Sequence, residues 1–237
     1  MPPSDDFTRA AAALHGADVG DDLCAPFLSA LPVTGVAIST VGNPFGSETV
    51  CASDATAAQL DEIQLDLGEG PCWEAVRTRT PVLEPDVQAA TSARWPVALQ
   101  AMREAGLGAV FAFPMRLDTL DIGVVDLYMR VPGTLEDQPV QEALALTEAA
   151  AREVLRRALL RVESGADGGS DAAAGAYSRR EVHQASGMLA AQTGADADDA
   201  LLILRGHAFA AGRPVRSLAA DVVARVVDFT DRNDVAP

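Results

Sequence analysis

Residues 178–229 read SRREVHQASGMLAAQTGADADDALLILRGHAFAAGRPVRSLAADVVARVVDF, and this stretch carries the start and stop signals of three short helices. Ser178 and Glu181 form a capping box, in which the serine hydroxyl accepts from the Glu181 amide and the Glu181 carboxylate reaches back to the Ser178 amide. Gly194 suits the left-handed position that ends a helix. The pattern therefore predicts a first helix that begins after Ser178 and ends near Gly194.

Two further helices are predicted by the same kind of signal. Asp196 caps the second helix, Gly212-Arg213-Pro214 ends it, and Ser217 caps the third. The tail is therefore expected to form a three-helix bundle. The inward positions follow a three-four spacing, and they are Val182, Ala185 and Leu189, then Leu201, Leu204 and Ala208, then Leu218, Val222, Val226 and Phe229.

Small residues mark the places where these helices are expected to cross. Gly187 is the most informative, because glycine inside a helix costs about 0.5–1 kcal/mol relative to alanine. The sequence tolerates that cost if a neighbouring backbone or a ligand comes close to Gly187. The other small residues of the set are Ala185, Ala200, Ala208 and Ala219.

The order of residues across the three helices resembles the ANTAR domain, an RNA-binding antitermination module. The resemblance implies a dimer that binds tandem stem-loops in nascent RNA and prevents transcription termination. Ser186 departs from the pattern, since many members carry a basic or amide residue there. The matching residues are Ala185, Gly187 and Leu189, then Ala200, Leu204, Arg205 and Ala208, then Leu218, Ala219, Val222 and Val223.

Candidate RNA contacts are the basic and imidazole side chains at helix starts or on the sides between helices. Affinity for nucleic acid draws heavily on phosphate neutralisation, so these side chains would have to gather on one face. The candidates are Arg179, Arg180, His183, Arg205 and Arg216.

The charge of the chain is uneven. The formal net charge is −16, and all 18 basic residues are arginine. Residues 1–176 hold 11 arginines against 26 acidic residues, a net charge of −15, whereas residues 177–237 hold seven against eight, a net charge of −1. The acidic front part should repel nucleic acid, so the tail is the only credible RNA-binding surface.

The front part predicts an α+β fold, with an antiparallel sheet and helices packed on one of its faces. Turn residues separate the predicted strands, and the last two strands are joined by the polar turn 118–121. The predicted strands are 35–41, 48–53, 109–116 and 122–129, and the predicted helices lie within 7–31, over 55–65 and around 95–105.

The run Leu67–Ala75, LGEGPCWEA, followed by Pro81-Val82 and Asp86, resembles the GAF domain. The likeness extends over residues 10–150 and implies a sensory fold that binds varied small molecules or only mediates dimer contacts. No ligand is named by the fold. The side chains expected to line a pocket under this segment are Cys72, Trp73, Phe111 and Phe113.

No cofactor, metal site or catalytic set is predicted. His15 is the only histidine before the tail and lies near the N-terminus, whereas a proximal histidine is the common haem ligand. The motifs of nucleophilic triads, phosphate-binding loops and metal-ligand clusters are missing from the sequence. The enzymatic alternative is a thiol-dependent methionine sulfoxide reductase, as in some GAF relatives, for which Cys51 and Cys72 would be the only pair.

Residues 139–163 predict a long connector helix, with apolar positions close to a heptad seam. This helix either forms a parallel dimer or packs back on its own sheet. Residues 164–176 are rich in glycine, alanine, serine and aspartate and predict a flexible linker. The predicted organisation is therefore a GAF-like sensor domain over 7–138, the connector over 139–163, the linker over 164–176 and an ANTAR-like domain over 177–232.

The chain is expected to work in the cytoplasm. The sequence shows no apolar run long enough to span a membrane and no signal peptide. Cys24, Cys51 and Cys72 are an odd set without CxxC spacing, so all three are expected as thiols in a reducing compartment. The alternative to an RNA-binding regulator is a sensor whose tail only dimerises or binds DNA or protein.

Overall fold

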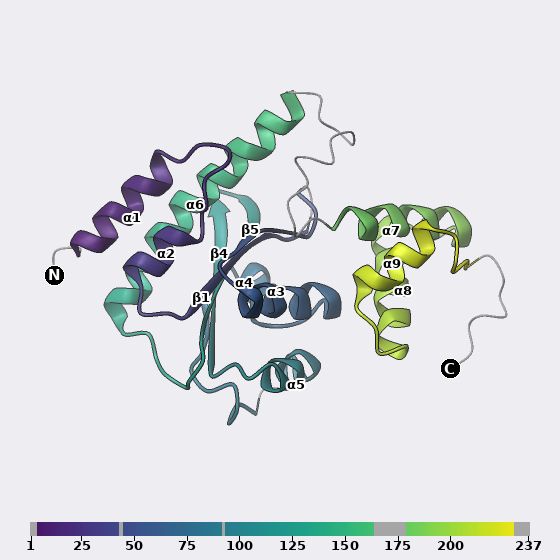
Figure 1. Cartoon of the computed structure of the whole chain (residues 1–237), viewed down its shortest axis with the longest axis horizontal. Coiled ribbons are helices and arrows are strands. Elements are labelled where there is room, and N and C mark those ends of the chain that lie inside the picture. The colour runs from purple at the N-terminus through teal and green to yellow at the C-terminus, as the bar shows by residue number, and fades with distance from the viewer. Residues whose placement is uncertain (1–3, 43–44, 92, 164–178, 230–237) are drawn as a thin grey trace. The chain divides into compact units, whose positions relative to one another are not determined.

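The computed structural model describes residues 4–42, 45–91, 93–163 and 179–229, and the chain divides into two compact units, Met1–Ser178 and Arg179–Pro237 (Figure 1). The capping role predicted for Ser178 and the linker predicted over 164–176 lie outside the described residues. None of the described helices combines the length and the apolar character that crossing a bilayer requires.

The first unit is built on an antiparallel sheet in the strand order β2-β1-β5-β4-β3. The hairpin predicted over 109–129 is confirmed, with Phe113 opposite Val125 in the register. The strands are β1 Gly35–Thr40, β2 Glu48–Ala52, β3 Val82–Glu84, β4 Ala109–Leu117 and β5 Leu120–Met129.

Helices cover both faces of this sheet, so the expectation of helices on one face only was wrong. Figure 1 shows α1, α2 and α6 on one side and α3, α4 and α5 on the other. All six residues of β1 are buried for this reason. The helices are α1 Asp5–His15, α2 Ala25–Ala30, α3 Ala55–Leu67, α4 Pro71–Thr78, α5 Pro96–Glu104 and α6 Asp137–Glu163.

Helix α6 packs on its own sheet, which is one of the two arrangements that the sequence left open. Ala143, Leu146 and Val154 from α6 are buried in the same cluster as Phe111 and Phe113 from β4. Burying such side chains is worth roughly 1.5–3 kcal/mol for each large one. The apolar stripe of this helix is therefore used within the first unit.

A disulfide joins Cys24, at the start of α2, to Cys51 in β2. The expectation of three thiols was wrong for these two residues, because the fold brings α2 and β2 together although 27 positions separate the cysteines in the sequence. Cys72 keeps its thiol and is buried.

The second unit is the predicted three-helix bundle, with α7 Arg180–Thr193, α8 Ala197–Ala210 and α9 Val215–Val223. Gly194 takes the left-handed conformation after α7, and the Asp196 carboxylate accepts from the Asp199 amide at the start of α8, both as predicted. The core consists of Val182, Ala185, Leu189, Ala200, Leu204, Ala208, Val215, Leu218, Ala219 and Val222.

The ends of the third helix differ from the prediction. Pro214, not Ser217, occupies the N-cap position. The amides of Ser217 and Leu218 donate to the Pro214 carbonyl, so Ser217 already lies within the first turn of the helix. The helix ends at Val223, and Val226 is 74% exposed rather than buried. Phe229 still packs against the bundle core.

Candidate functional site

The outward face of α7 carries basic, imidazole and amide side chains, with the exposed Glu181 at its edge. Arg180, His183, Gln184, Gly187 and Ala191 are all exposed, and their spacing places them on the face opposite the buried Val182, Ala185 and Leu189. A methyl group built on Gly187 would meet nothing within 4 Å. The intramolecular close approach expected at Gly187 is therefore wrong, and its bare backbone faces the surroundings.

The remaining predicted RNA contacts do not share that face. Arg179 precedes α7 and is only 4% exposed, so its side chain is taken into the unit. Arg205 and Arg216 are half-buried on α8 and α9. Of the five predicted contacts, the structure brings Arg180 and His183 together on one helix face. Gln184 was missed, although the three-four spacing of α7 could have identified it.

The outward face of α8 is apolar at its centre. Leu202 is 65% exposed and Phe209 is 62% exposed, with Gly206 between them on the same side. The opposite side of the helix is buried in the core. A helix that is apolar on both sides is normally covered on both, so this face is a second candidate interaction surface.

In the first unit, the Gly-Glu-Gly-Pro run forms a joint between three helices. Gly68 ends α3 in the left-handed conformation, and Pro71 begins α4. The Glu69 carboxylate accepts hydrogen bonds from the amides of Val97 and Ala98, at 2.7 and 2.8 Å. Glu69 therefore caps α5 from outside the helix, because the residue at the N-cap position, Trp95, makes no capping hydrogen bond.

Gln64 fills the space that Gly70 leaves open. A methyl group on Gly70 would lie 2.7 Å from Gln64 Oε1, and Gly70 has a positive φ of 134°. Gln64 Oε1 accepts from the Cys72 amide at 2.8 Å, and Gln64 Nε2 donates to Asp126 Oδ2 at 2.9 Å. Trp73 Nε1 donates to the Gln64 carbonyl at 2.7 Å. This part of the predicted pocket is thus a closed hydrogen-bonded core.

The four side chains predicted to line a pocket lie on two faces of the sheet. Cys72 and Trp73 belong to the cluster under α3 and α4, whereas Phe111 and Phe113 are buried with α6 on the other face. Side chains alternate along a strand, so Ala112, between the two phenylalanines, is the residue that joins Cys72. The four therefore do not line one cavity. A surface depression of about 510 Å³ lies elsewhere, between α1 and α2.

A buried carboxyl stands at the centre of the sheet. Asp126 in β5 is 1% exposed and pairs with Ala37 and Ala112 on the adjacent strands. Its Oδ1 has no hydrogen-bond partner among the residues that the structure describes. Burial, together with the charge of the nearby Asp61, raises the pKa of Asp126 well above its usual value. Asp61 accepts from the hydroxyls of Ser39 and Thr49.

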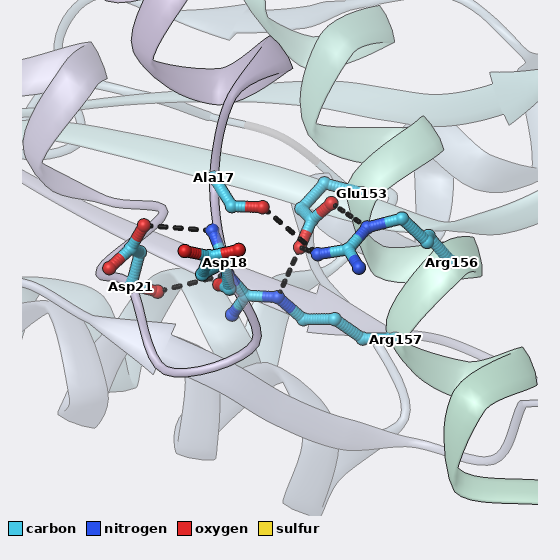
Figure 2. A network of polar contacts seen from close by, with 6 residues as sticks. All are labelled: Ala17, Asp18, Asp21, Glu153, Arg156 and Arg157. Carbon is cyan, nitrogen blue, oxygen red and sulfur yellow. Dashed lines mark hydrogen bonds and ion pairs between the residues drawn. The ribbon is translucent and has the colours of Figure 1, made fainter.

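Two arginines of α6 hold the loop between α1 and α2 (Figure 2). Arg156 Nη2 donates to the Ala17 carbonyl at 2.9 Å, and Arg157 Nη2 donates to the Asp18 and Asp21 carbonyls at 2.6 and 3.1 Å. Glu153, buried between them, accepts from both guanidinium groups. Burial alone would raise the pKa of the Glu153 carboxyl, but the hydrogen bonds and charges of Arg156 and Arg157 lower it below the usual value.

Comparison with known families identifies both units. The family model described as the GAF domain matches residues 21–154, which is more than half of the chain, and the model described as the ANTAR domain matches residues 172–223. The chain belongs to the GAF family and carries a C-terminal ANTAR domain. Both resemblances read from the sequence are thereby confirmed.

Solved structures agree with the GAF fold. The GAF domain of a phosphoenolpyruvate-protein phosphotransferase from Coxiella burnetii is similar at 14% identity and a TM-score of 0.50, over 68% of this chain and 95% of that chain. The corresponding domain from Acinetobacter has 11% identity and a TM-score of 0.50, over 66% and 94%. At these identities the likeness concerns the fold alone. A comparison with curated proteins finds no match.

The pair of domains makes the chain a GAF-regulated ANTAR regulator. ANTAR domains bind RNA and act in transcription antitermination, and GAF domains are sensors. The outward faces of α7 and α8 belong to the ANTAR domain. The hydrogen bonds around Gln64 and those of Glu153 belong to the first unit, which contains the GAF domain. The structure does not bring Cys51 and Cys72 together, since they lie in clusters on opposite faces of the sheet.

Proposed function

We propose that this protein is a transcription antitermination regulator that binds stem-loop RNA through the outward face of α7. The observation that carries the proposal is a helix face with Arg180, His183 and Gln184 around the bare backbone of Gly187. Phosphates can approach such a face closely, and an amide and an imidazole can bond base edges in an RNA loop. The proposed target is a tandem stem-loop in a nascent transcript.

The GAF domain is proposed as the controlling element. The acidic charge of the first part of the chain disfavours contact with RNA. The GAF domain is therefore proposed to change the state of the tail and not to bind the RNA itself. A small-molecule ligand of this domain and a cytoplasmic location stay predictions. The domain boundaries at 138, 163 and 176 likewise stay predictions.

The test is binding of the full chain to a tandem stem-loop RNA, with a matched DNA duplex as the control. We expect affinity for the RNA that falls as salt rises, because phosphate contacts release counterions, and much weaker binding to the duplex. Equal affinity for the two nucleic acids would favour the alternative of a DNA-binding tail. A chain that binds neither would favour a tail that contacts only protein.

The outward face of α8 supports a homodimer as the working form. Leu202 and Phe209 are both exposed on the outward side of α8, seven positions apart. In a two-fold antiparallel pair of α8 helices, Leu202 would pack on the partner's Phe209. Such self-complementarity is what a two-fold interface requires.

A further inference from the structure

The Cys24–Cys51 disulfide connects two elements that lie far apart in the sequence. The Cα atoms are 6.4 Å apart. Cys24 is fully buried, and Cys51 lies half-buried in the edge strand β2. Cys51 is therefore the more exposed of the two residues and the one at which we place the attack of an incoming thiol.

A disulfide is unusual in a protein with the function proposed above. A regulator of nascent transcripts works where thiol reductants keep cysteines reduced, and disulfides found there are mostly transient, catalytic or redox-sensing. We propose that Cys24 and Cys51 form a reversible thiol–disulfide site through which the first unit responds to disulfide-class oxidants. This inference rests on the proposed function for its cellular setting, but its chemistry does not depend on RNA.

The reaction is thiol–disulfide exchange. In reduction, one thiolate of an external dithiol attacks Cys51 Sγ, the Cys24–Cys51 bond breaks, and Cys24 leaves as a thiolate that takes up a proton. The second thiol of the reductant, as its thiolate, then displaces Cys51, which also becomes a protonated thiol. Two electrons have passed to the protein, and the reductant has become a cyclic disulfide. Oxidation by a disulfide follows the reverse course.

The site is connected to α6 through a short series of contacts. The Cys24 amide donates to Asp22 Oδ1 at 2.8 Å. Asp21, next in the loop, accepts from the Asp18 amide through its carboxylate and from Arg157 through its carbonyl. Arg157 belongs to α6, the last helix described in the first unit. Release of Cys24 therefore loosens the loop that Arg156 and Arg157 hold.

The first experiment counts thiols by alkylation and mass measurement on the full chain. Under oxidised glutathione we expect one alkylated thiol after unfolding, that of Cys72. After treatment of the folded protein with a dithiol we expect three. The variant Cys72→Ser should show zero and two, because the pair does not involve Cys72. A bond that forms in no redox buffer, or that yields to the dithiol only after unfolding, would overturn the proposal.

The second experiment measures hydrogen exchange of the same protein in both redox states. On reduction, we expect amides of residues 17–24 and of the C-terminal half of α6 to exchange about tenfold faster, because local opening becomes easier. In Glu153→Gln the α6 response should shrink, whereas Glu148→Gln, which alters the exposed pair with Arg152 on the same helix, should retain it. Equal exchange in both states would contradict the connection to α6. Neither readout uses RNA, so failure of RNA binding would leave this test intact.

Discussion

Glu153 Oε1 accepts a hydrogen bond from Arg157 Nε at 2.6 Å, and the same guanidinium group reaches the carbonyls of the α1–α2 loop. The carboxylate is 6% exposed and Arg157 is 13% exposed. Removing one partner of a charged pair with so little access to solvent strongly destabilises the fold, because the other charge is left buried and unpaired. The loop and α6 are therefore joined by a contact that depends on one carboxylate.

Glu153→Gln should destabilise the first unit by about 1–3 kcal/mol, because two guanidinium groups lose their charged acceptor. Since the folded pKa of Glu153 is lowered, its contribution is present above the usual carboxyl pKa and is lost as the pH falls through the folded value. Urea unfolding of both proteins between pH 3 and 7 checks this. An equal dependence on pH in the variant would show that Glu153 is not responsible.

Asp126→Asn should reduce a dependence of stability on pH that has the opposite sign to that of Glu153. The folded pKa of Asp126 is raised, so its contribution to stability is present below the usual aspartate pKa and is lost as the pH rises toward the folded value. An amide is neutral at every pH, so the variant should gain on the wild type as the pH increases. Denaturant midpoints at pH 5, 7 and 8 provide the measurement, and a constant difference between the two proteins would contradict the prediction.

Glu69→Ala should destabilise the first unit by about 1–2 kcal/mol, because two amides at the start of α5 lose their acceptor. Glu69→Gln keeps an acceptor oxygen and should recover part of the loss. Glu104→Ala, at the exposed end of the same helix, is the control and should change the unfolding free energy by less than about 0.5 kcal/mol. A similar loss in the two alanine variants would rule out the capping role.

Two variants at Gly187 should separate its effect on stability from its effect on RNA binding, and the first is Gly187→Ala. A methyl group at this position would meet nothing within 4 Å, so the variant should gain about 0.5–1 kcal/mol in the unfolding free energy of the tail. Gly187→Glu should lower affinity for stem-loop RNA by about tenfold or more, since it adds bulk and a negative charge to the α7 face. Ala220→Glu, which places the same charge on the exposed side of α9, is the control. RNA affinity equal in the two glutamate variants would move the interface away from α7.

Leu202→Ser combined with Phe209→Ser should weaken self-association of the full chain by about tenfold or more, because the exposed apolar centre of α8 is removed. Sedimentation at micromolar concentration provides the measurement. Val226→Ser, another exposed apolar position but outside α8, should leave the mass unchanged. A wild-type chain that is monomeric at these concentrations would reject the α8 interface.

The sequence predicted those parts of the fold that rest on local signals. The hairpin over 109–129 was identified by its polar turn, and Asp196 by its place before an apolar repeat. Phe111 and Phe113 could not be assigned to a face, because helices cover both sides of β4 and Val110, Phe111, Ala112 and Phe113 are all apolar. Alternation carries no information in such a strand.

Other features depended on distances that no local pattern encodes. Cys24 and Cys51 meet because α2 packs against the sheet. The odd number of cysteines had favoured three thiols over a disulfide. At the third helix of the tail, Pro214 was assigned to the end of the second helix, whereas it directly precedes the third, three positions before Ser217. The outward face of α7, by contrast, was available from the same spacing that identified its core.

The position of β2 at the end of the strand order has a practical consequence for handling the protein. An edge strand presents amides and carbonyls that can pair with another chain and seed aggregates. Because Cys51 ties β2 to α2, the bond also restrains this exposed edge. Storage with strong reductants should therefore promote slow precipitation, and light scattering with and without a dithiol would show whether the bond acts as a safeguard during purification.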